Sequence, residues 1–191
     1  MKMVFDLAKD FKQMPLSEIN KLLDSELYEV RLGAVSIMDF KTRHKSITEA
    51  ERKALFDLYI KRHDRINNWG LVDRSAPRIV GWYLQDKSKN ILYKLAKSNR
   101  VSERRTAIVA PLWFITKQND VIDALGIAEA LVNDSEEIIN TALGATLHYV
   151  GVANKAELEM FLDKHYKTMP KVTLRLATRR QEALKKKYAH S

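Results

Sequence analysis

A tryptophan and an aspartate stand four residues apart in the segment from Asn67 to Gly81. At this spacing, Trp69 and Asp73 lie one turn apart on the same side of a helix. The indole ring offers an apolar wall, and a carboxylate beside it can stabilise positive charge that develops in a transition state. The pair therefore fits chemistry at a cationic, sugar-centred transition state. The alternative interpretation is structural, with Trp69 as a core anchor and Asp73 as a surface or capping acid.

Other catalytic chemistries lack their residues or their spacing. The chain has no cysteine, which excludes disulfides, thiolate metal sites and thiol nucleophiles. No phosphate-cradling glycine run and no serine nucleophile elbow occurs. The histidines show no spacing typical of a metal site: His44, His63, His148, His165 and His190. We therefore expect no bound metal ion.

Basic residues outnumber acidic ones by 33 to 24, giving a formal net charge of +9. Such an excess favours a polyanionic partner, of which nucleic acid is the leading class. The charge is unevenly distributed, since residues 119–154 contain no lysine or arginine and include an acidic block from Asp120 to Glu137. The basic excess is thus divided between the first 118 residues and the last 37.

Basic side chains recur at corresponding places along the chain, and we expect them to form a strip that binds nucleic acid. In the last of these segments, three of them are spaced four apart and share one helix face. The alternative is a solvated face that is basic by chance. The predicted strip consists of Arg31, Arg74, Arg78, Arg104, Arg105, Lys171, Arg175 and Arg179.

The chain carries an internal repeat that would position these residues. A small residue returns within an apolar helical pattern at steps of 42, 31, 35 and 35 residues: Ala34, Ala76, Ala107, Ala142 and Ala177. A period of this length is typical of stacked helix pairs. The six glycines and four prolines are too few for a hairpin-rich sandwich or barrel. We therefore predict an all-α fold, a right-handed α-solenoid of about five HEAT-like helix pairs, as a single domain over residues 1–191.

Apolar residues recur at a helical period along most of the chain. Pro77 and Pro111 fall inside two predicted helices, where each removes a backbone hydrogen bond, so we expect kinks or shifted helix starts there. Thr48 is a plausible N-cap. The predicted helices cover residues 17–23, 26–44, 49–60, 69–83, 88–97, 102–116, 121–131, 136–149, 155–166 and 172–188, the last with a break.

The repeats, the segment from Asn67 to Gly81 and the run from Arg104 to Ile108 resemble the HEAT-like DNA alkylation-repair family, the AlkD-like DNA glycosylases. The resemblance covers nearly the whole chain, and its most specific part is the Trp-x-x-x-Asp helix. It implies a curved solenoid that cradles duplex DNA, alkylated DNA included, and cleaves the N-glycosidic bond of N3- or N7-alkylated purines without a cofactor. By motif match, Trp69 would contact the deoxyribose and Asp73 would stabilise the cationic sugar and orient water. Arg105 would hold the DNA backbone near the lesion.

The sequence departs from this family at one aromatic position. Active members carry a further tryptophan on the helix that corresponds to residues 138–149, and the matching segment from Leu143 to Leu147 has none. The alternative function is therefore a relative that binds DNA structures, or a protein, through the same face without excising bases.

The amino-terminal residues and the length of the apolar stretches bear on where the protein is expected to be located. The first ten residues carry charges throughout and contain no apolar signal-peptide core. The most apolar stretch, Ile108 to Ile115, has eight residues, too few to span a bilayer. We therefore expect a cytoplasmic monomer that does not enter a membrane.

Overall fold

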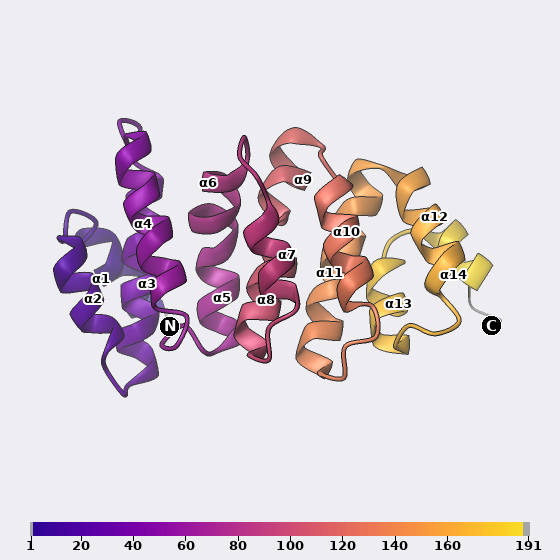
Figure 1. The fold of residues 1–191 in the computed structure, drawn as a ribbon, viewed down its shortest axis with the longest axis horizontal. Coiled ribbons are helices and arrows are strands. Elements are labelled where there is room, and N and C mark those ends of the chain that lie inside the picture. The colour runs from indigo at the N-terminus through magenta and orange to yellow at the C-terminus, as the bar shows by residue number, and fades with distance from the viewer. Residues whose placement is uncertain (1, 189–191) are drawn as a thin grey trace. The chain divides into compact units, whose positions relative to one another are not determined.

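The computed structural model describes residues 2–188, and every regular element within that range is helical (Figure 1). The fold class of this range is thus all-α, as predicted. In the described range no helix has the length and apolar character needed to cross a membrane. The helices are α1 (Lys2–Asp10), α2 (Leu16–Leu23), α3 (Tyr28–Thr42), α4 (Glu49–Lys61), α5 (Trp69–Ala76), the π-helix η1 (Pro77–Gly81), α6 (Trp82–Leu84), α7 (Asn90–Ala96), α8 (Val101–Val109), α9 (Leu112–Gln118), α10 (Ile122–Leu131), α11 (Glu137–Ala153), α12 (Lys155–His165), α13 (Lys171–Ala177) and α14 (Glu182–Tyr188).

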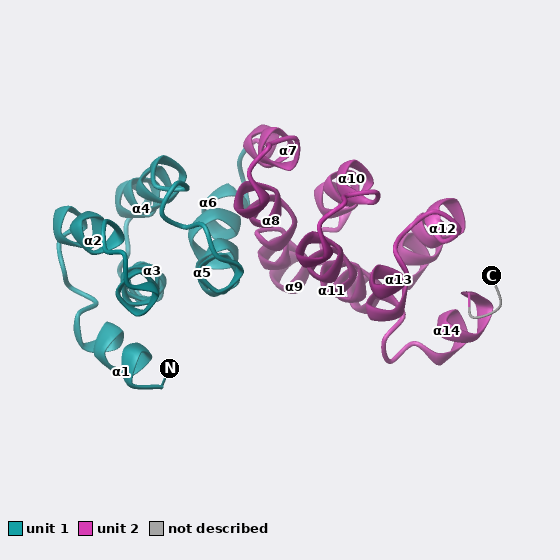
Figure 2. Ribbon diagram, turned by 90° about the horizontal axis from the view of Figure 1, so that it is seen from below, with its two compact units in different colours: residues 1–87 teal, residues 88–191 magenta. Residues whose placement is uncertain are grey.

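The chain contains two compact units, Met1–Lys87 and Ser88–Ser191, coloured separately in Figure 2. In the first unit, α3 packs against α2 on one side and against α5 and η1 on another, and α1 covers a further part of α3. Helix α4 packs on η1, α6 and α2. Helix α3 is therefore the centre of the first unit.

The second unit is a stack of helix pairs in two layers. Helices α7, α10 and α12 lie along one side, and α8, α11 and α13 lie along the other (Figure 2). Helix α11 packs directly between α8 and α13. Two threonine hydroxyls connect this row: Thr146 donates to the carbonyl oxygen of Ile108 at 2.9 Å, and Thr173 donates to that of Asn140 at 3.0 Å.

The recurring small residues are buried where the helices approach one another. Each is at most 4% exposed: Ala34 and Ala76 in the first unit, and Ala107, Ala142 and Ala177 in the second. A close approach is most evident at Gly144, where a Cβ atom would lie 2.8 Å from the carbonyl oxygen of Thr173. Small residues at these places let the backbones of neighbouring helices pack closely.

Several predicted helix boundaries are confirmed. Thr48 and Glu51 form a reciprocal capping box at the start of α4, which satisfies two backbone N–H groups. At Pro77, α5 gives way to the π-helix η1, and Pro111 separates α8 from α9. The predicted break in the last helix falls between α13 and α14, where Arg180 adopts a left-handed φ of 64°.

Helix α1 is an element that the sequence analysis did not predict. Its apolar residues Val4 and Phe5 are half-buried and Ala8 is buried, on the side that packs on α3. The helix is nine residues long, a length that is marginal in isolation. Packing on α3 therefore stabilises a segment whose own periodicity is too short to identify it.

Candidate functional site

Helix α5 begins at Trp69 and presents the predicted pair to solvent. The side-chain oxygen of Asn68 accepts a hydrogen bond of 2.8 Å from the N–H of Gly70 and so caps the helix. Trp69 is 55% exposed, and Asp73 is exposed one turn further along. The interpretation of Trp69 as a core anchor is therefore wrong, and the pair forms an aromatic and anionic surface.

The first turn of α5 lies directly on α3. A Cβ atom at Gly70 would come within 2.5 Å of the Tyr28 hydroxyl oxygen, so a larger residue there would displace the Tyr28 side chain. The opposite edge of the helix is apolar, with Leu71 and Val72 fully buried. These contacts fix the orientation of the helix that carries Trp69 and Asp73.

Two predicted strip residues, Arg74 and Arg78, reach a buried carboxylate on α3. The Asp39 side chain is 1% exposed, and its Oδ2 lies 2.9 Å from Nη1 of Arg74 and 2.6 Å from Nη2 of Arg43. Its Oδ1 lies 3.5 Å from Nε of Arg78. Burial raises the pKa of Asp39, and Arg74 and Arg43 oppose that rise. We call these four residues, Asp39, Arg43, Arg74 and Arg78, the Asp39 cluster.

Two further strip residues, Arg31 and Arg104, make equivalent contacts in different units. Arg31 donates to the carbonyl oxygen of Ser25 at 2.8 Å, and Arg104 donates to that of Ser98 at 2.9 Å. Each acceptor precedes its arginine by six residues. Arg104 also pairs with Asp134, at 2.6 Å and 3.2 Å between nitrogen and oxygen atoms. The repeat in the sequence thus corresponds to a repeated connection between a helix and the loop before it.

Arg105 lies deeper than its neighbour. It is 7% exposed, and its guanidinium donates to the carbonyl oxygen of Ile138 at the start of α11. This contact connects α8 to α11 at a distance of 33 residues in the sequence.

The last three strip residues lie on a solvent face. Lys171, Arg175 and Arg179 are exposed, the first two on α13 and Arg179 just after it, while Thr173 and Ala177 are buried on the opposite side. Lys171 and Arg175 are one turn apart within α13, whereas Arg179 lies beyond the end of this helix. They form the most accessible group of cations among the predicted residues.

The helix that lacks the further tryptophan is α11. On its solvent side Thr141, Tyr149 and Val152 are exposed, and Ala145 is partly exposed. No tryptophan occurs in α11. The aromatic side chain that this face does offer is Tyr149.

The structure groups the predicted residues within units. In the first unit, Arg31, Trp69, Asp73, Arg74 and Arg78 lie on α3, α5 and η1. The remaining predicted residues, Arg104, Arg105, Lys171, Arg175 and Arg179, belong to the second unit. Sequence reasoning missed Asp39 and Arg43. The signal available was a carboxylate inside the apolar run 35–40.

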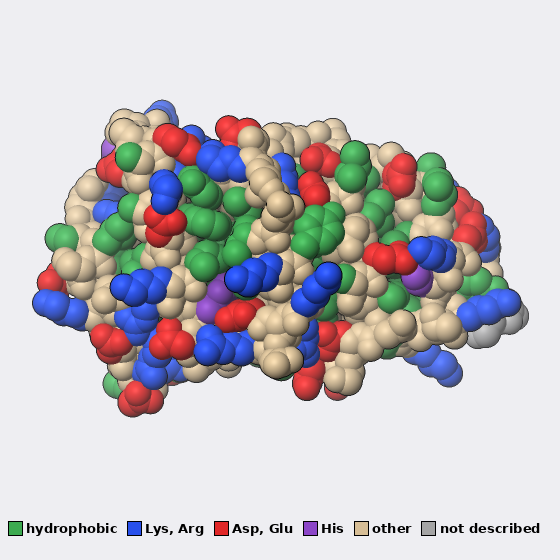
Figure 3. All heavy atoms as spheres, in the orientation of Figure 1, with side chains coloured by type: hydrophobic (Ala, Val, Ile, Leu, Met, Phe, Trp, Pro, Cys, Tyr) green, Lys and Arg blue, Asp and Glu red, His purple; other side chains and the backbone are tan. Residues whose placement is uncertain are grey.

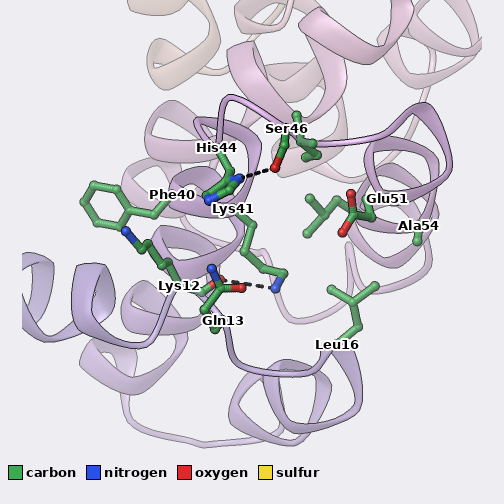
Figure 4. Close-up of a pocket in the computed structure, with 11 residues that line it drawn as sticks. Lys12, Gln13, Leu16, Phe40, Lys41, His44, Ser46, Glu51 and Ala54 are labelled. Atoms are coloured by element: carbon green, nitrogen blue, oxygen red, sulfur yellow. Dashed lines mark hydrogen bonds between the residues drawn. The ribbon is translucent and has the colours of Figure 1, made fainter.

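A cavity of about 330 Å³ lies elsewhere in the first unit, between the loop after α1, the end of α3 and the start of α4 (Figure 4). Lys41 crosses it and donates to the carbonyl oxygens of Lys12 and Met14, at 3.2 Å each. None of the predicted site residues lines this cavity. Over residues 2–188, no group of three His, Asp or Glu side chains is arranged to hold a metal ion.

On the face shown in Figure 3, lysine and arginine side chains alternate with acidic ones. Ion pairs of this kind include Lys53 with Asp57 on α4 at 2.7 Å, and Lys164 of α12 with Glu129 of α10 at 2.5 Å. Exposed pairs of opposite sign largely cancel one another's field. In both units, therefore, exposed lysines on these helices have acidic partners beside them.

Comparison with known families gives one match. Residues 1–180 match the family described as DNA alkylation repair enzyme. Searches of the curated proteins and of the solved structures found no match.

Proposed function

The chain belongs to the DNA alkylation repair enzyme family, and on this premise we propose that it binds duplex DNA and excises N3- or N7-alkylated purines. The family supports a role in DNA repair. The observation that carries the finer proposal is the exposed pair of Trp69 and Asp73 on α5, beside each other in a helix whose orientation α3 fixes.

The chemistry needs little more than charge stabilisation. An N3- or N7-alkylated purine carries a positive charge and is already a good leaving group, so the glycosidic bond breaks toward an oxocarbenium-like sugar. The Asp73 carboxylate stabilises that charge as it develops and orients the attacking water. Trp69 contacts the deoxyribose through its ring face. In this proposal neither a metal ion nor an organic cofactor takes part.

The DNA-binding surface is proposed to include all eight predicted basic residues on one right-handed solenoid of about five HEAT-like pairs. The exposed group on α13 would contact phosphates directly. Arg31, Arg104 and Arg105 have carbonyl or carboxylate partners, so their contribution would be to hold the helices and loops that line the surface. The cytoplasmic location and the monomeric state stay predictions.

A second candidate function rests on α11. Because the solvent side of this helix offers Tyr149 and small residues instead of a tryptophan, the wall beside a lesion is reduced. The second candidate is therefore a relative that binds DNA structures, or a protein, without removing bases.

One experiment separates the two candidates. Duplexes with a single N7-methylguanine or N3-methyladenine are incubated with excess protein, and the released base is measured under single-turnover conditions. Release above the spontaneous rate, lowered by Asp73→Asn and unchanged by Asp57→Asn, supports the glycosylase. Asp57 is a matched control because it is an exposed carboxylate paired with Lys53 on α4. Release no faster than spontaneous depurination leaves the binding candidate, and equal rates for wild type and Asp73→Asn contradict the mechanism.

Trp69 tests the other half of the pair. An aromatic wall contacts the sugar in both the ground state and the transition state. Trp69→Ala should therefore weaken binding of damaged duplex as well as lowering the rate, whereas Asp73→Asn should leave affinity for undamaged DNA nearly unchanged. An Asp73→Asn variant that loses affinity as much as rate would contradict this division.

A further inference from the structure

The Asp39 cluster holds three guanidinium groups around one buried carboxylate. Asp39 is 1% exposed, and a buried carboxylate needs a partner because an unpaired buried charge is costly. One guanidinium can satisfy that need in a bidentate pair. Here three arginines share the carboxylate, within 2.6, 2.9 and 3.5 Å, so the four side chains together carry a net charge of +2.

Aromatic rings hold the guanidinium groups in place. The Arg74 guanidinium carbon lies 5.0 Å from the Phe5 ring centre and 5.1 Å from that of Phe40. Arg43 lies over the same Phe40 ring, also at 5.1 Å. Nε of Arg74 also donates to the Ser36 hydroxyl at 3.2 Å. These contacts restrict the side chains before any ligand arrives, which lowers the entropy cost of binding.

The cluster is partly exposed to solvent. The Arg74 side chain is 20% exposed, and those of Arg43 and Arg78 are 40% and 36% exposed. Two partly exposed guanidinium groups around a buried carboxylate can direct N–H groups at an anion in solvent. Arginine forks match the oxygens of a phosphate in this geometry.

We propose that the Asp39 cluster is a preformed binding site for a phosphate group of the DNA backbone, with Asp39 as its positioning residue. This inference rests on the proposed function, since it names a contact of the same DNA-binding surface. Arg74 follows Asp73 directly on α5, so a phosphate held by the cluster fixes the strand relative to the carboxylate of Asp73. A phosphodiester carries one negative charge, so it would leave the cluster with a net charge of +1.

The main test uses Arg43→Gln and Arg78→Gln, with Lys53→Gln as a matched control. Lys53 is an exposed cation of the same unit, paired with Asp57 outside the cluster, so its variant loses the same charge. Affinity for an undamaged duplex is measured against salt concentration. Each cluster variant should make the negative slope of log K against log salt shallower by about 0.9, equally for all DNA sequences. The control variant should leave this slope unchanged. Cluster variants that match Lys53→Gln overturn the site.

Asp39→Asn separates positioning from simple charge. This variant makes the protein more positive by one, so a purely electrostatic account expects tighter binding. A positioning role expects weaker binding, because the arginines lose the group that holds them. Tighter binding by a folded Asp39→Asn variant contradicts the positioning role.

A second measurement does not depend on DNA. Thermal unfolding is compared in inorganic phosphate and in chloride at equal ionic strength, because an anion that binds the folded state raises its Tm. Phosphate should raise the Tm of wild type and Lys53→Gln more than that of Arg43→Gln. If the wild-type protein does not bind duplex DNA, the proposed function fails, and the Tm comparison alone tests the phosphate site. Equal Tm increases in phosphate for wild type, Lys53→Gln and Arg43→Gln would then overturn the phosphate site.

Discussion

Helices α8 and α13 both carry predicted DNA-binding residues, and these residues have different surroundings in the two helices. The α8 arginines are turned into the protein, where Arg104 pairs with Asp134 and Arg105 donates to the carbonyl oxygen of Ile138. On the α13 face, Lys171 and Arg175 are exposed instead. The difference shows that a recurring cation can be either a connector between helices or an exposed surface charge. The partner on the next element decides which.

The acidic block from Asp120 to Glu137 supplies several such partners. Asp134 pairs with Arg104 of α8, and Asp123 accepts a 3.0 Å hydrogen bond from the Tyr93 hydroxyl of α7. The Glu129 carboxylate contacts two side chains of α12: its Oε1 lies 2.5 Å from Nζ of Lys164, and its Oε2 lies 2.7 Å from Nε2 of His165. The block therefore joins α10 and its following loop to helices on both sides, which accounts for its position between two basic regions.

The largest expected effect comes from breaking a connector. Arg104→Ala leaves the largely buried Asp134 carboxylate without its guanidinium partner, and we expect a loss of about 3 kcal/mol in the free energy of unfolding. Urea titration followed by circular dichroism measures it. The matched control is Arg100→Ala, an exposed arginine that pairs with Glu103 and should change stability by less than about 0.5 kcal/mol. Equal losses in the two variants would remove the distinction between connector and surface cation.

The second largest loss of stability is expected where α13 packs on α11. In Gly144→Ala the new Cβ atom would lie 2.7 Å from Cβ of Leu176 and 2.8 Å from the carbonyl oxygen of Thr173, so α13 must shift. We expect a loss of about 2 kcal/mol by urea titration. Gly33→Ala in α3 is the control, because its nearest neighbour, Val4 Cγ1, is 3.9 Å away and the helix gains up to about 1 kcal/mol. A stable Gly144→Ala protein would show that α13 can move freely on α11.

A smaller effect concerns pH at the end of α13. Burial, followed by the charges of Arg179 and Arg180, lowers the pKa of His148 below its ordinary value of 6.5. In the unfolded chain His148 binds a proton near pH 6.5, whereas in the folded chain it does so only at lower pH. The free energy of unfolding therefore decreases as the pH falls below 6.5. Unfolding free energies at about pH 7.5 and about pH 5.5 should therefore differ more for wild type than for His148→Gln. The same difference in both proteins would mean that His148 does not contribute.

The smallest effect on stability is expected for the exposed cations. Replacing all three of Lys171, Arg175 and Arg179 by Gln should change the unfolding free energy by less than about 0.5 kcal/mol at each site, because none is buried. Duplex affinity should nevertheless fall, and the salt slope should decrease by about 0.9 for each phosphate that the variant no longer neutralises. A fluorescence anisotropy titration at several salt concentrations measures both. Unchanged affinity in the folded triple variant would place the DNA-binding surface elsewhere.

The local sequence pattern was sufficient to predict most helices and several of their ends. Thr48 caps α4 as its residue type predicts, and Pro77 and Pro111 interrupt helices because a proline lacks the N–H group. Helix α1 was missed because nine residues give too short a periodic signal and the packing partner, α3, lies outside the segment.

The candidate site was predictable in part for the same reason. Trp69 and Asp73 share one helix face through a spacing of four, which any helix produces. Asp39 was not identified, since its arginine partners on α5 and η1 follow it by 35 and 39 residues. A contact across that separation depends on how the helices pack and leaves no trace in the 3.6-residue period of either helix.

The sequence by itself determined the all-α class, the family, the helix that carries Trp69 and Asp73, and the recurrence of buried small residues. These properties follow from helical periodicity and from residue types within a few turns. The tertiary structure decided which cations are connectors and which are exposed, and it placed three arginines on one buried carboxylate. The physical reason is that the energy of a charge depends on its burial and its partner, and packing between distant segments fixes both.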